Sequence, residues 1–442
     1  MSRNIIIKDF LKYYFRNSIY FKNLLNKLEA REKYSVEELR EYQLEKLHKI
    51  VRVAYENVPF YRNIFKQKKL APSDIRTIDD LQKLPQINKK LVQDNFKDFR
   101  NRNFRGLVFK GLTSGTTGSP GVFLRDLRSI NLENAAFWRH YHWGKKDRGT
   151  KRVTLRGDIV CCSDRNKPPF WRYNYFTKEL LMSSYHLSDE NMYYYIDEIN
   201  KYHPFDLNGY PSAIYLLANF CKRKGANLKF SVVFTSSEML HDYQREEIEQ
   251  TFSCKTFDWY GNAERVAAFG QCELGSYHEM SDYSIVEYLP SGQGQLEIVG
   301  TTLHNYVMPL IRYKTGDYIE ESEKDYCGCG RSLRVIGKIY GRDDDILELA
   351  NGKKLGRLDH VFKGFNFIKE AQIVQKALDA IEVNVVTIGE YSREHEKAIK
   401  ERLHKYIGEV EIRYSINPVE RIKRTNAGKF KFVMNLLNND HI

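Results

Sequence analysis

Apolar residues recur every three or four positions through most of residues 1–105, which is the periodicity of amphipathic helices. The longest such run covers residues 35–58. Ser35 and Glu38 have the spacing of a capping box at its start, and Pro59 ends it because proline cannot continue the helical hydrogen bonds. Residues 1–105 are therefore predicted to form a mainly helical lead-in to the rest of the chain.

Beyond residue 105 short apolar runs alternate with amphipathic ones. This alternation predicts an α/β fold with some α+β character, in which mixed β-sheets are flanked by helices. A strand, a helix and a second strand expected within 381–416 suffice for a small α+β domain. We therefore expect a large N-terminal domain over 1–340, a small mobile C-terminal domain over 345–442, and a hinge near 341–345. The strands of the large domain are expected over 105–114, 151–162, 230–237 and 295–302, and two of its helices over 212–225 and 241–252.

The composition is that of a globular protein, with 442 residues of which 42% are hydrophobic and 13% aromatic. No stretch approaches the roughly 18 consecutive apolar residues of a membrane helix, so no integral membrane segment is predicted. The N-terminus is basic and aromatic but lacks the apolar core and cleavage site of a signal peptide. It is predicted to be a helix packed on its own domain, with an amphipathic helix on a membrane surface as the alternative.

The seven cysteines, in a long chain without a secretory signal, indicate a cytoplasmic protein, with peripheral attachment at the inner membrane as the alternative. The net charge of +13 suits anionic partners such as nucleotides, acidic carrier proteins or anionic lipid. No basic block interleaved with aromatic residues marks a nucleic-acid surface, so no nucleic acid is expected as a partner.

The sequence "LTSGTTGSPG", which follows a predicted strand, concentrates glycines and hydroxyl side chains. It does not fit the nucleotide-binding P-loop pattern, because its glycines are too close together and no lysine follows. Backbone N–H groups and hydroxyls in such a loop still suit phosphate oxygens, and a solvated turn is the alternative. The residues concerned are Ser114, Gly115, Thr116, Thr117 and Gly118.

Four later segments carry the remaining chemistry, although each one alone is a weak signal. They offer an aromatic face, a pair of carboxylates and a lysine on a glycine turn. In order along the chain they are "DWYGNAE" (258–264), "YKTGD" (313–317), "YGRDDDIL" (340–347) and "RTNAGKFKF" (424–432).

Together with the glycine-rich loop, these segments resemble the motifs of the adenylate-forming superfamily, which includes acyl-CoA synthetases, peptide-synthetase adenylation domains and luciferases. They occur in the same order as in that superfamily. The segments "VPFYRNIF", "LPQINKK", "NGYPSAI" and "CGCGR" resemble the phenylacetate–CoA ligase branch, especially its relatives encoded with capsule and surface-polysaccharide synthesis. The resemblance covers nearly the whole chain.

The resemblance implies an ATP site. The glycine-rich loop would hold the β- and γ-phosphates. Tyr260 would stack on the adenine, with Gly261 and Ser237 beside it, and Asp317 and Arg342 would hydrogen-bond the ribose hydroxyls.

The resemblance also implies the catalytic residues. Glu264 would coordinate Mg²⁺, and Lys429 would reach the carboxylate and the α-phosphate during adenylation. Asp344 would be the hinge residue on which the small domain turns. Tyr210 and Ser212, in "NGYPSAI", are candidates for the wall of the acyl pocket, with core packing as the alternative.

The implied activity is that of an ATP-dependent ligase that forms an acyl-adenylate from a small carboxylic acid, releases pyrophosphate and transfers the acyl group. The acceptor stays open between coenzyme A, a phosphopantetheine carrier protein and an aminosugar of surface or capsular polysaccharide. An aryl- or acyl-CoA ligase is one alternative. A degenerate nucleotide-binding homologue is another, because Gly121 and Ala263 stand where many relatives have lysine and a hydroxyl residue.

A Cys₃His set gives a separate prediction of a structural zinc site. Cys272 and His278 lie in "QCELGSYH", and Cys327 and Cys329 lie in "YCGCGR". The Cys-x-Cys spacing is tighter than usual for zinc, so free thiols in a glycine turn are the alternative.

Overall fold

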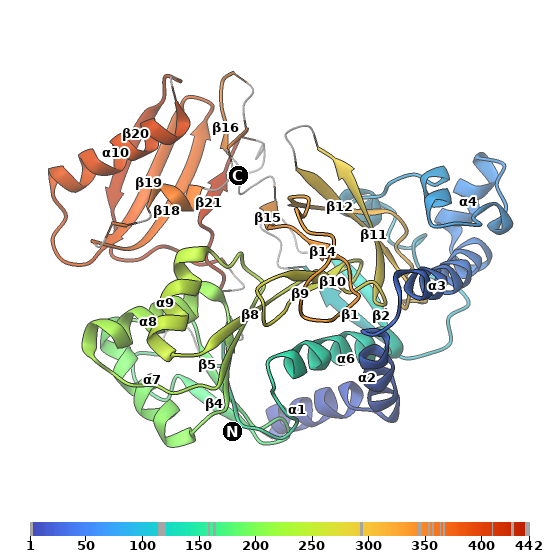
Figure 1. Ribbon diagram of the computed structural model, residues 1–442, viewed down its shortest axis with the longest axis horizontal. Helices are drawn as coiled ribbons and strands as arrows, with labels where there is room; N and C mark the ends of the chain where they lie inside the picture. The colour runs from blue at the N-terminus through green and yellow to red at the C-terminus, as the bar shows by residue number, and fades with distance from the viewer. Residues whose placement is uncertain are drawn as a thin grey trace.

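Helices fill most of the first hundred residues of the computed structural model, as predicted (Figure 1). Glu38 N–H donates to Ser35 Oγ (3.2 Å) and Ser35 N–H to the Glu38 carboxylate (2.7 Å), so the capping box is present. The α-helices are α1 (Arg3–Arg16), α2 (Ile19–Arg31), α3 (Val36–Asn57), α4 (Pro59–Gln67) and α5 (Lys89–Asp94), with 3₁₀ turns at Pro72–Asp74 and Asp79–Lys83. The structure describes residues 3–113, 121–157, 160–161, 165–291, 295–342, 347–351, 354–355, 358–362, 364–365, 367–408, 410–425 and 428–437.

Nine strands form the central sheet, in the spatial order β14 (Val335–Ile336), β10 (Tyr277–Glu279), β9 (Ala268–Gln271), β8 (Lys255–Gly261), β7 (Val232–Ser236), β6 (Asp206–Gly209), β3 (Arg152–Arg156), β5 (Glu179–Ser183) and β4 (Trp171–Asn174). The strands from β8 to β5 run parallel, and the others pair antiparallel. Helices α7 (Asp189–Tyr202), α8 (Pro211–Lys224) and α9 (Asp242–Phe252) pack on one face of this sheet, and α6 (Leu127–Trp143) and α2 pack on the other. Burial on both faces explains why every residue of β7, "VVFTS", is buried.

A second sheet joins the central sheet to the N-terminal helices. Its order is β11 (Ser284–Pro290), β12 (Leu296–Thr302), β13 (Tyr313–Ile319) and β15 (Ile339–Arg342), all antiparallel. The core between them combines residues of α3 and α4 with residues around β11 and β13. The hairpin β1 (Val108–Leu112) and β2 (Val122–Asp126) lies beside this core.

The C-terminal residues form a smaller unit that sits at the upper left of Figure 1. Its sheet has the order β20 (Arg413–Pro418), β19 (Ala380–Thr387), β18 (Ile368–Ala377) and β21 (Val433–Asn435), and α10 (Arg393–Ile407) packs on it. A small hairpin, β16 (Leu347–Glu348) and β17 (Lys354–Leu355), and a 3₁₀ turn at Leu358–Val361 precede it. The strand–helix–strand order expected within 381–416 is present, whereas β18 and β21 were not predicted.

The predicted fold class is confirmed: mixed sheets flanked by helices form the large part of the chain, and a small α+β unit follows it. Among the described residues, no helix is both long and apolar enough to cross a lipid bilayer.

Candidate active site

The candidate site lies at the edge of the central sheet where its parallel strands end. In parallel sheets this edge collects the loops that bind ligands, because all the strands deliver their carboxyl ends there. Ser237 follows β7, and Gly261 is the last residue of β8. Ser237 has a φ of 75°, a left-handed conformation that is uncommon for residues other than glycine and clusters at functional sites.

One cavity of about 690 Å³ brings together six of the residues predicted to bind ATP or act in catalysis. It is lined by residues from the central sheet, from β13 and from the C-terminal unit. The predicted residues among its lining are Ser237, Tyr260, Gly261, Glu264, Asp317 and Lys429.

Tyr260 and Asp317 are in direct contact in this cavity. The Tyr260 hydroxyl donates a hydrogen bond of 2.6 Å to Asp317 Oδ2, which fixes both side chains against the cavity wall. The Tyr260 ring stacks on Phe269, with 5.1 Å between centroids and 23° between planes. Arg342 is the backbone partner of Asp317 in the pairing of β13 with β15, so the two predicted ribose residues are neighbours in the sheet.

Glu264 is buried, with 6% of its surface exposed, yet it lines the cavity. The Tyr313 hydroxyl donates a hydrogen bond of 2.9 Å to Glu264 Oε1. A carboxylate has two oxygens with about four acceptor positions in total, so one at a cavity wall can accept a hydrogen bond and also take up a ligand. It is the hard oxygen donor that Mg²⁺ prefers, so this residue fits the predicted metal role.

Lys429 reaches the cavity from a loop of the C-terminal unit that docks on the large domain. Its backbone N–H donates to Thr425 Oγ1 (3.1 Å), and Thr425 N–H donates back to Lys429 O (2.9 Å), which closes a tight turn. The preceding Gly428 has a φ of 71°. A β-carbon at Gly428 would lie 2.7 Å from Gly157 Cα and 2.9 Å from Tyr185 Cζ. Only glycine therefore allows this turn, and this depth of docking, without displacement of its neighbours.

Glu238 connects this loop to the large domain, and the sequence analysis gave it no role. Its carboxylate accepts one hydrogen bond from Phe430 N–H (2.7 Å) and one from Ser212 N–H (3.2 Å). Burial raises the pKa of the Glu238 carboxyl, although the hydrogen bonds from Ser212 and Phe430 and the charge of Arg424 oppose the shift. One carboxylate thus joins the turn that carries the predicted catalytic lysine to the start of α8. The only sequence signal was its place directly after Ser237, which was expected beside the adenine.

The other predicted residues are less well placed or lie outside the described residues. Tyr210 is buried in the core beneath α8, and neither it nor Ser212 is among the residues that line the cavity. Their role in an acyl pocket stays a prediction. The phosphate-loop residues Ser114, Gly115, Thr116, Thr117 and Gly118 and the hinge residue Asp344 lie outside the described residues.

The two ends of the glycine-rich loop are described, and they are tied together at the cavity. Thr113 N–H donates to Gly121 O (2.9 Å), and Gly121 N–H donates to Thr113 Oγ1 (2.8 Å). Thr113 also lines the cavity. The predicted phosphate loop therefore starts and ends at the rim of the site.

Lys89 is a second residue that the sequence analysis missed, although "LPQINKK" was noted. A β-carbon at Gly121 would lie 3.0 Å from Lys89 Cε, so this side chain fills the space beside the glycine. Ile87 N–H donates to Arg312 O (3.0 Å) and Lys314 N–H to Ile87 O (2.8 Å), which anchors the segment before Lys89 to β13. Lys89 and Glu264 both line a neighbouring cavity of about 340 Å³. A lysine from α5 thus stands close to the position where many relatives have one in the loop.

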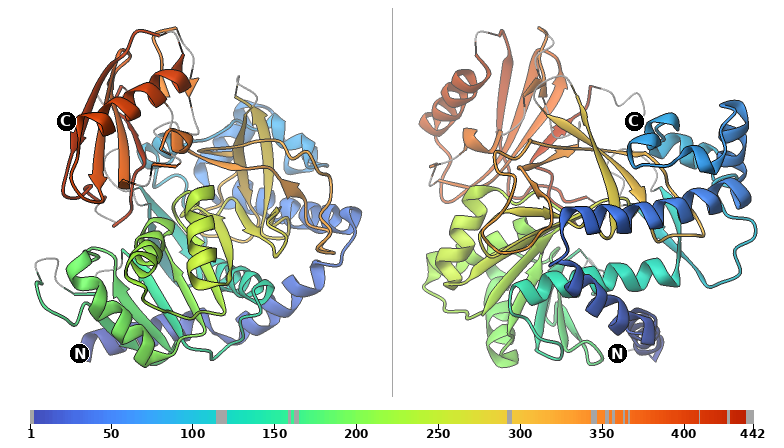
Figure 2. Two further views of the ribbon diagram at one scale, coloured as in Figure 1. Left: turned by 60° about the vertical axis from the view of Figure 1, so that its left-hand side comes forward. Right: turned by 45° about the vertical axis from the view of Figure 1, so that its right-hand side comes forward.

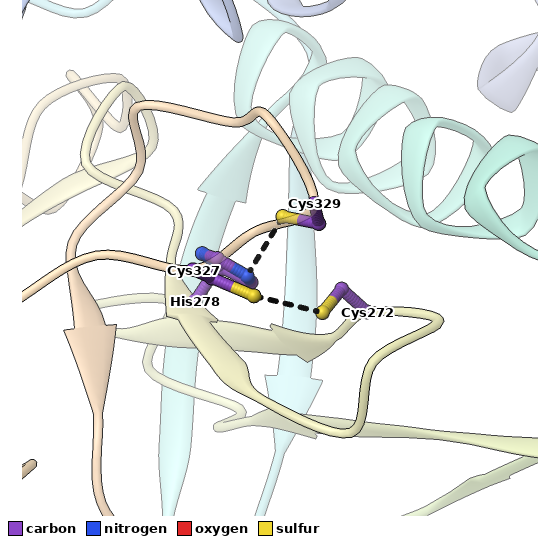
Figure 3. Close-up of side chains that lie close together, drawn as sticks. All are labelled: Cys272, His278, Cys327 and Cys329. Carbon is purple, nitrogen blue, oxygen red and sulfur yellow. Dashed lines mark hydrogen bonds between the residues drawn. The ribbon is translucent and has the colours of Figure 1, made fainter. Parts of the chain in front are cut away.

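The Cys₃His set converges outside this cavity (Figure 3). Cys272 Sγ lies 3.8 Å from Cys327 Sγ, and Cys329 Sγ lies 3.4 Å from His278 Nε2. Tetrahedral zinc, with bonds of about 2.3 Å to sulfur and about 2.0 Å to nitrogen, separates its ligands by about 3.8 Å (S to S) and about 3.5 Å (S to N). The donor set therefore fits zinc in both composition and spacing.

A hydrogen bond orients the histidine of this set. Its Nδ1 lies 3.0 Å from Leu333 O, and because a carbonyl can only accept, Nδ1 carries the proton. This leaves the lone pair of Nε2 directed at the cysteines, as in metal-binding histidines.

Comparisons with known proteins relate the chain to two groups. A family model for the CapK C-terminal domain matches residues 347–436. Protein CapK of Staphylococcus aureus is 27% identical over 412 residues, which cover 90% of this chain and 89% of CapK. A phenylacetate–coenzyme A ligase of Pseudomonas putida is 28% identical over 336 residues, 72% of this chain and 74% of the ligase. The chain is a homologue of CapK and of the phenylacetate–CoA ligases.

Solved structures agree on the fold. Structures of 2-hydroxyisobutyryl-CoA ligase align with 92% of this chain and 91% of their own length, at 18% sequence identity. The TM-score is 0.69 for the postadenylation state in complex with 2-HIB-AMP and 0.55 for the thioesterification state with 2-HIB-AMP and CoA. The predicted resemblance to the adenylate-forming superfamily and its phenylacetate–CoA ligase branch is confirmed.

Proposed function

We propose that this protein is an ATP-dependent ligase that activates a carboxylic acid. A carboxylate oxygen attacks the α-phosphate of ATP, an acyl-adenylate forms, and pyrophosphate leaves. The observation that carries the proposal is the convergence of Tyr260, Glu264, Asp317 and Lys429 on one cavity. The homology to phenylacetate–CoA ligases supports the same reaction class.

The reaction brings two anions together, so the site must supply positive charge where negative charge develops. Glu264 would hold Mg²⁺, which supplies that charge at the phosphate oxygens. Lys429 would place its ammonium group between the carboxylate and the α-phosphate. Tyr260 and Asp317, already joined by a hydrogen bond, would position the nucleoside. Lysine suits a mobile domain because its charge sits at the end of a long, flexible stem.

For the second step we propose transfer of the acyl group in surface or capsular polysaccharide biosynthesis, on the strength of the match with CapK over 89% of that protein. The acceptor is either a thiol, of coenzyme A or a phosphopantetheine carrier, or the amine of an aminosugar. An aryl- or acyl-CoA ligase is the second candidate, and the phenylacetate–CoA ligases support it. Because the reaction consumes ATP, we propose the cytoplasm as its location.

The first step is tested by exchange of labelled pyrophosphate into ATP in the presence of aryl, fatty, hydroxy and amino acids. We expect exchange that depends on one class of acid. Lys429→Ala should lose about 10²–10³-fold of this activity, because it removes charge stabilisation of the transition state. Lys423→Ala, an exposed lysine of the same unit, is the matched control. ATP binding without exchange for any acid would instead identify a degenerate nucleotide-binding homologue.

We further propose that Cys272, His278, Cys327 and Cys329 bind a structural zinc ion that fastens the loop before β14 to the turn between β9 and β10. We expect about one zinc per chain in protein purified without chelator, and loss of that zinc in the Cys327→Ser/Cys329→Ser variant. Cys254→Ser, a partly buried cysteine elsewhere, should keep it. A metal-free wild type, or a double variant that retains zinc, would refute the site.

A further inference from the structure

Helix α1 is attached to the protein by its polar side. Asp9 is buried and accepts hydrogen bonds from Arg172, with Nη1 to Oδ2 at 2.5 Å and Nη2 to Oδ1 at 3.3 Å. From α6, Asn131 donates to Phe15 O (3.0 Å) and Asn134 donates to Arg16 O (2.9 Å). These contacts fix which side of the helix faces the protein.

The opposite side of α1 is apolar and exposed. At 100° per residue, Ile7, Phe10, Leu11 and Tyr14 lie between about 100° and 200° around the helix from Asp9, and Ile6 lies at about 60°. A surface helix of a globular protein normally turns its apolar side inward, so this helix has the reverse orientation. The exposed fractions are 45% for Ile6, 49% for Ile7, 46% for Phe10, 44% for Leu11 and 60% for Tyr14.

A neighbouring turn extends this apolar area. The Phe10 ring lies 5.5 Å from that of Phe176, which follows β4, and the adjacent Tyr175 is 78% exposed. We name the combined area the α1 surface, and it consists of Ile6, Ile7, Phe10, Leu11, Tyr14, Tyr175 and Phe176. Contiguous exposed apolar areas of this kind mark sites of association.

The charges beside the α1 surface indicate what it binds. Lys8 is exposed on α1 next to Leu11 around the helix, and Lys178 is exposed at the neighbouring turn. Lys12 lies on the Asp9 side of the helix, where its charge acts on Glu179. The acidic residue of the helix, Asp9, faces inward and is paired with Arg172. A second copy of the chain packed here would bring like charges together. An anionic lipid bilayer complements both the lysines and the apolar side chains, and tyrosine favours the membrane interface.

We propose that the α1 surface docks on an anionic lipid bilayer, with its apolar side chains at the level of the lipid headgroups. The helix lies at the lower edge of the molecule in all the views, on the opposite side from the C-terminal sheet (Figures 1 and 2). Docking there leaves the C-terminal unit clear of the membrane. The inference goes beyond the proposed reaction and does not depend on it.

Co-sedimentation of the full chain with lipid vesicles tests the proposal. We expect binding to vesicles of equal parts phosphatidylcholine and phosphatidylglycerol, weaker binding as salt is added, and far less binding to phosphatidylcholine alone. Lys8→Gln/Lys178→Gln should lower the partition coefficient about 25-fold, since each basic residue near an anionic surface contributes about fivefold. Phe10→Ser/Leu11→Ser should also lower it, by removal of apolar contact.

Matched controls come from exposed residues of the C-terminal unit: Leu378→Ser and Lys397→Gln should bind vesicles like the wild type. These variants should keep the wild-type unfolding temperature and activity, because the side chains they change are exposed and line neither cavity of the candidate site. The proposal would be overturned if the wild type did not bind anionic vesicles, or if both double variants bound them as tightly as the wild type. A wild-type dimer that Phe10→Ser/Leu11→Ser converts to a monomer would also overturn it and would assign the surface to a second copy.

Discussion

Replacing Glu238 with glutamine should weaken the docking of the Lys429 loop with little change in side-chain volume. The Glu238 carboxylate accepts hydrogen bonds from the backbone of Phe430 (2.7 Å) and of Ser212 (3.2 Å). Glutamine offers one oxygen acceptor in place of two, and its amide group would face a second N–H donor. One buried N–H would therefore lose its partner.

The size of the effect on docking depends on which of the two hydrogen bonds to Glu238 is broken when the C-terminal unit moves away. The bond from Ser212 lies within the large domain and contributes equally whether the loop is docked or not. The bond from Phe430 exists only in the docked state. A hydrogen bond to a charged group is worth about 1.5–3 kcal/mol, so its loss should lower the ratio of docked to undocked protein about 10- to 150-fold.

The assay is acid-dependent ATP–pyrophosphate exchange, with ATP affinity measured separately. In Glu238→Gln we expect exchange to fall by up to that factor while ATP affinity stays unchanged. Because burial raises the pKa of Glu238, lowering the pH should protonate this carboxylate and bring the wild-type rate toward that of the variant, and the variant should lack this pH dependence. Glu247→Gln, which changes an ion pair with Lys222 and a hydrogen bond from Thr251 within the large domain, is the control. Wild-type exchange in Glu238→Gln, or an unchanged pH profile, would refute the reasoning.

Two further predictions concern buried histidines and the glycine of the docked loop. Burial lowers the pKa of His140 and of His304 to about 3, so both stay neutral in the folded protein while the unfolded chain takes up protons below about pH 6.5. The free energy of unfolding should therefore fall as the pH drops from about 6.5 toward 3, by about 1.4 kcal/mol per pH unit for each histidine. Urea unfolding at several pH values measures this free energy. A free energy of unfolding that does not change over this pH range would contradict the prediction. Gly428→Ala should reduce exchange at least tenfold, because a left-handed alanine costs about 1–2 kcal/mol and its methyl group meets backbone 2.7 Å away. Exchange at the wild-type rate in Gly428→Ala would show that the loop does not dock this way during the reaction.

The sequence predicted the helices and strands that are determined by residues close together in the chain. Helix α3 follows from its capping box and periodicity, and β7 from its run of β-branched and aromatic residues. The order of the central sheet could not be predicted, because strands such as β10 and β14 pair across 55 residues or more, as in the Tyr277–Ile336 pair. Such pairings depend on tertiary packing, which leaves no local periodicity.

The same distinction applies to the candidate site: residues in local motifs were predicted, and a residue that acts through a distant backbone contact was not. Tyr260, Asp317 and Lys429 each sit in a recognisable motif, so resemblance located them before the cavity brought them together. Glu238 acts across 192 residues of sequence through a backbone N–H, and such a donor has no residue-type signature. The cysteine cluster was predictable because its chemistry is in the side chains themselves, and only their convergence required the structure.

We predict that Lys89 takes the role of the lysine that many relatives have at the position of Gly121. Moving the lysine from position 89 to position 121 tests this prediction. Lys89 fills the space beside Gly121 and borders the cavity that it shares with Glu264, so we expect its ammonium group to contact the phosphates of ATP. Lys89→Ala should raise the KM for ATP about tenfold or more, as loss of a charged hydrogen bond requires. Lys90→Ala is the matched control, since that side chain is 84% exposed and pairs only with Asp94 among described acidic groups. In Lys89→Ala the space beside position 121 opens, so adding Gly121→Lys should restore much of the lost affinity from the loop itself. Equal effects of Lys89→Ala and Lys90→Ala, or no recovery in the double variant, would show that the α5 lysine does not replace the loop lysine.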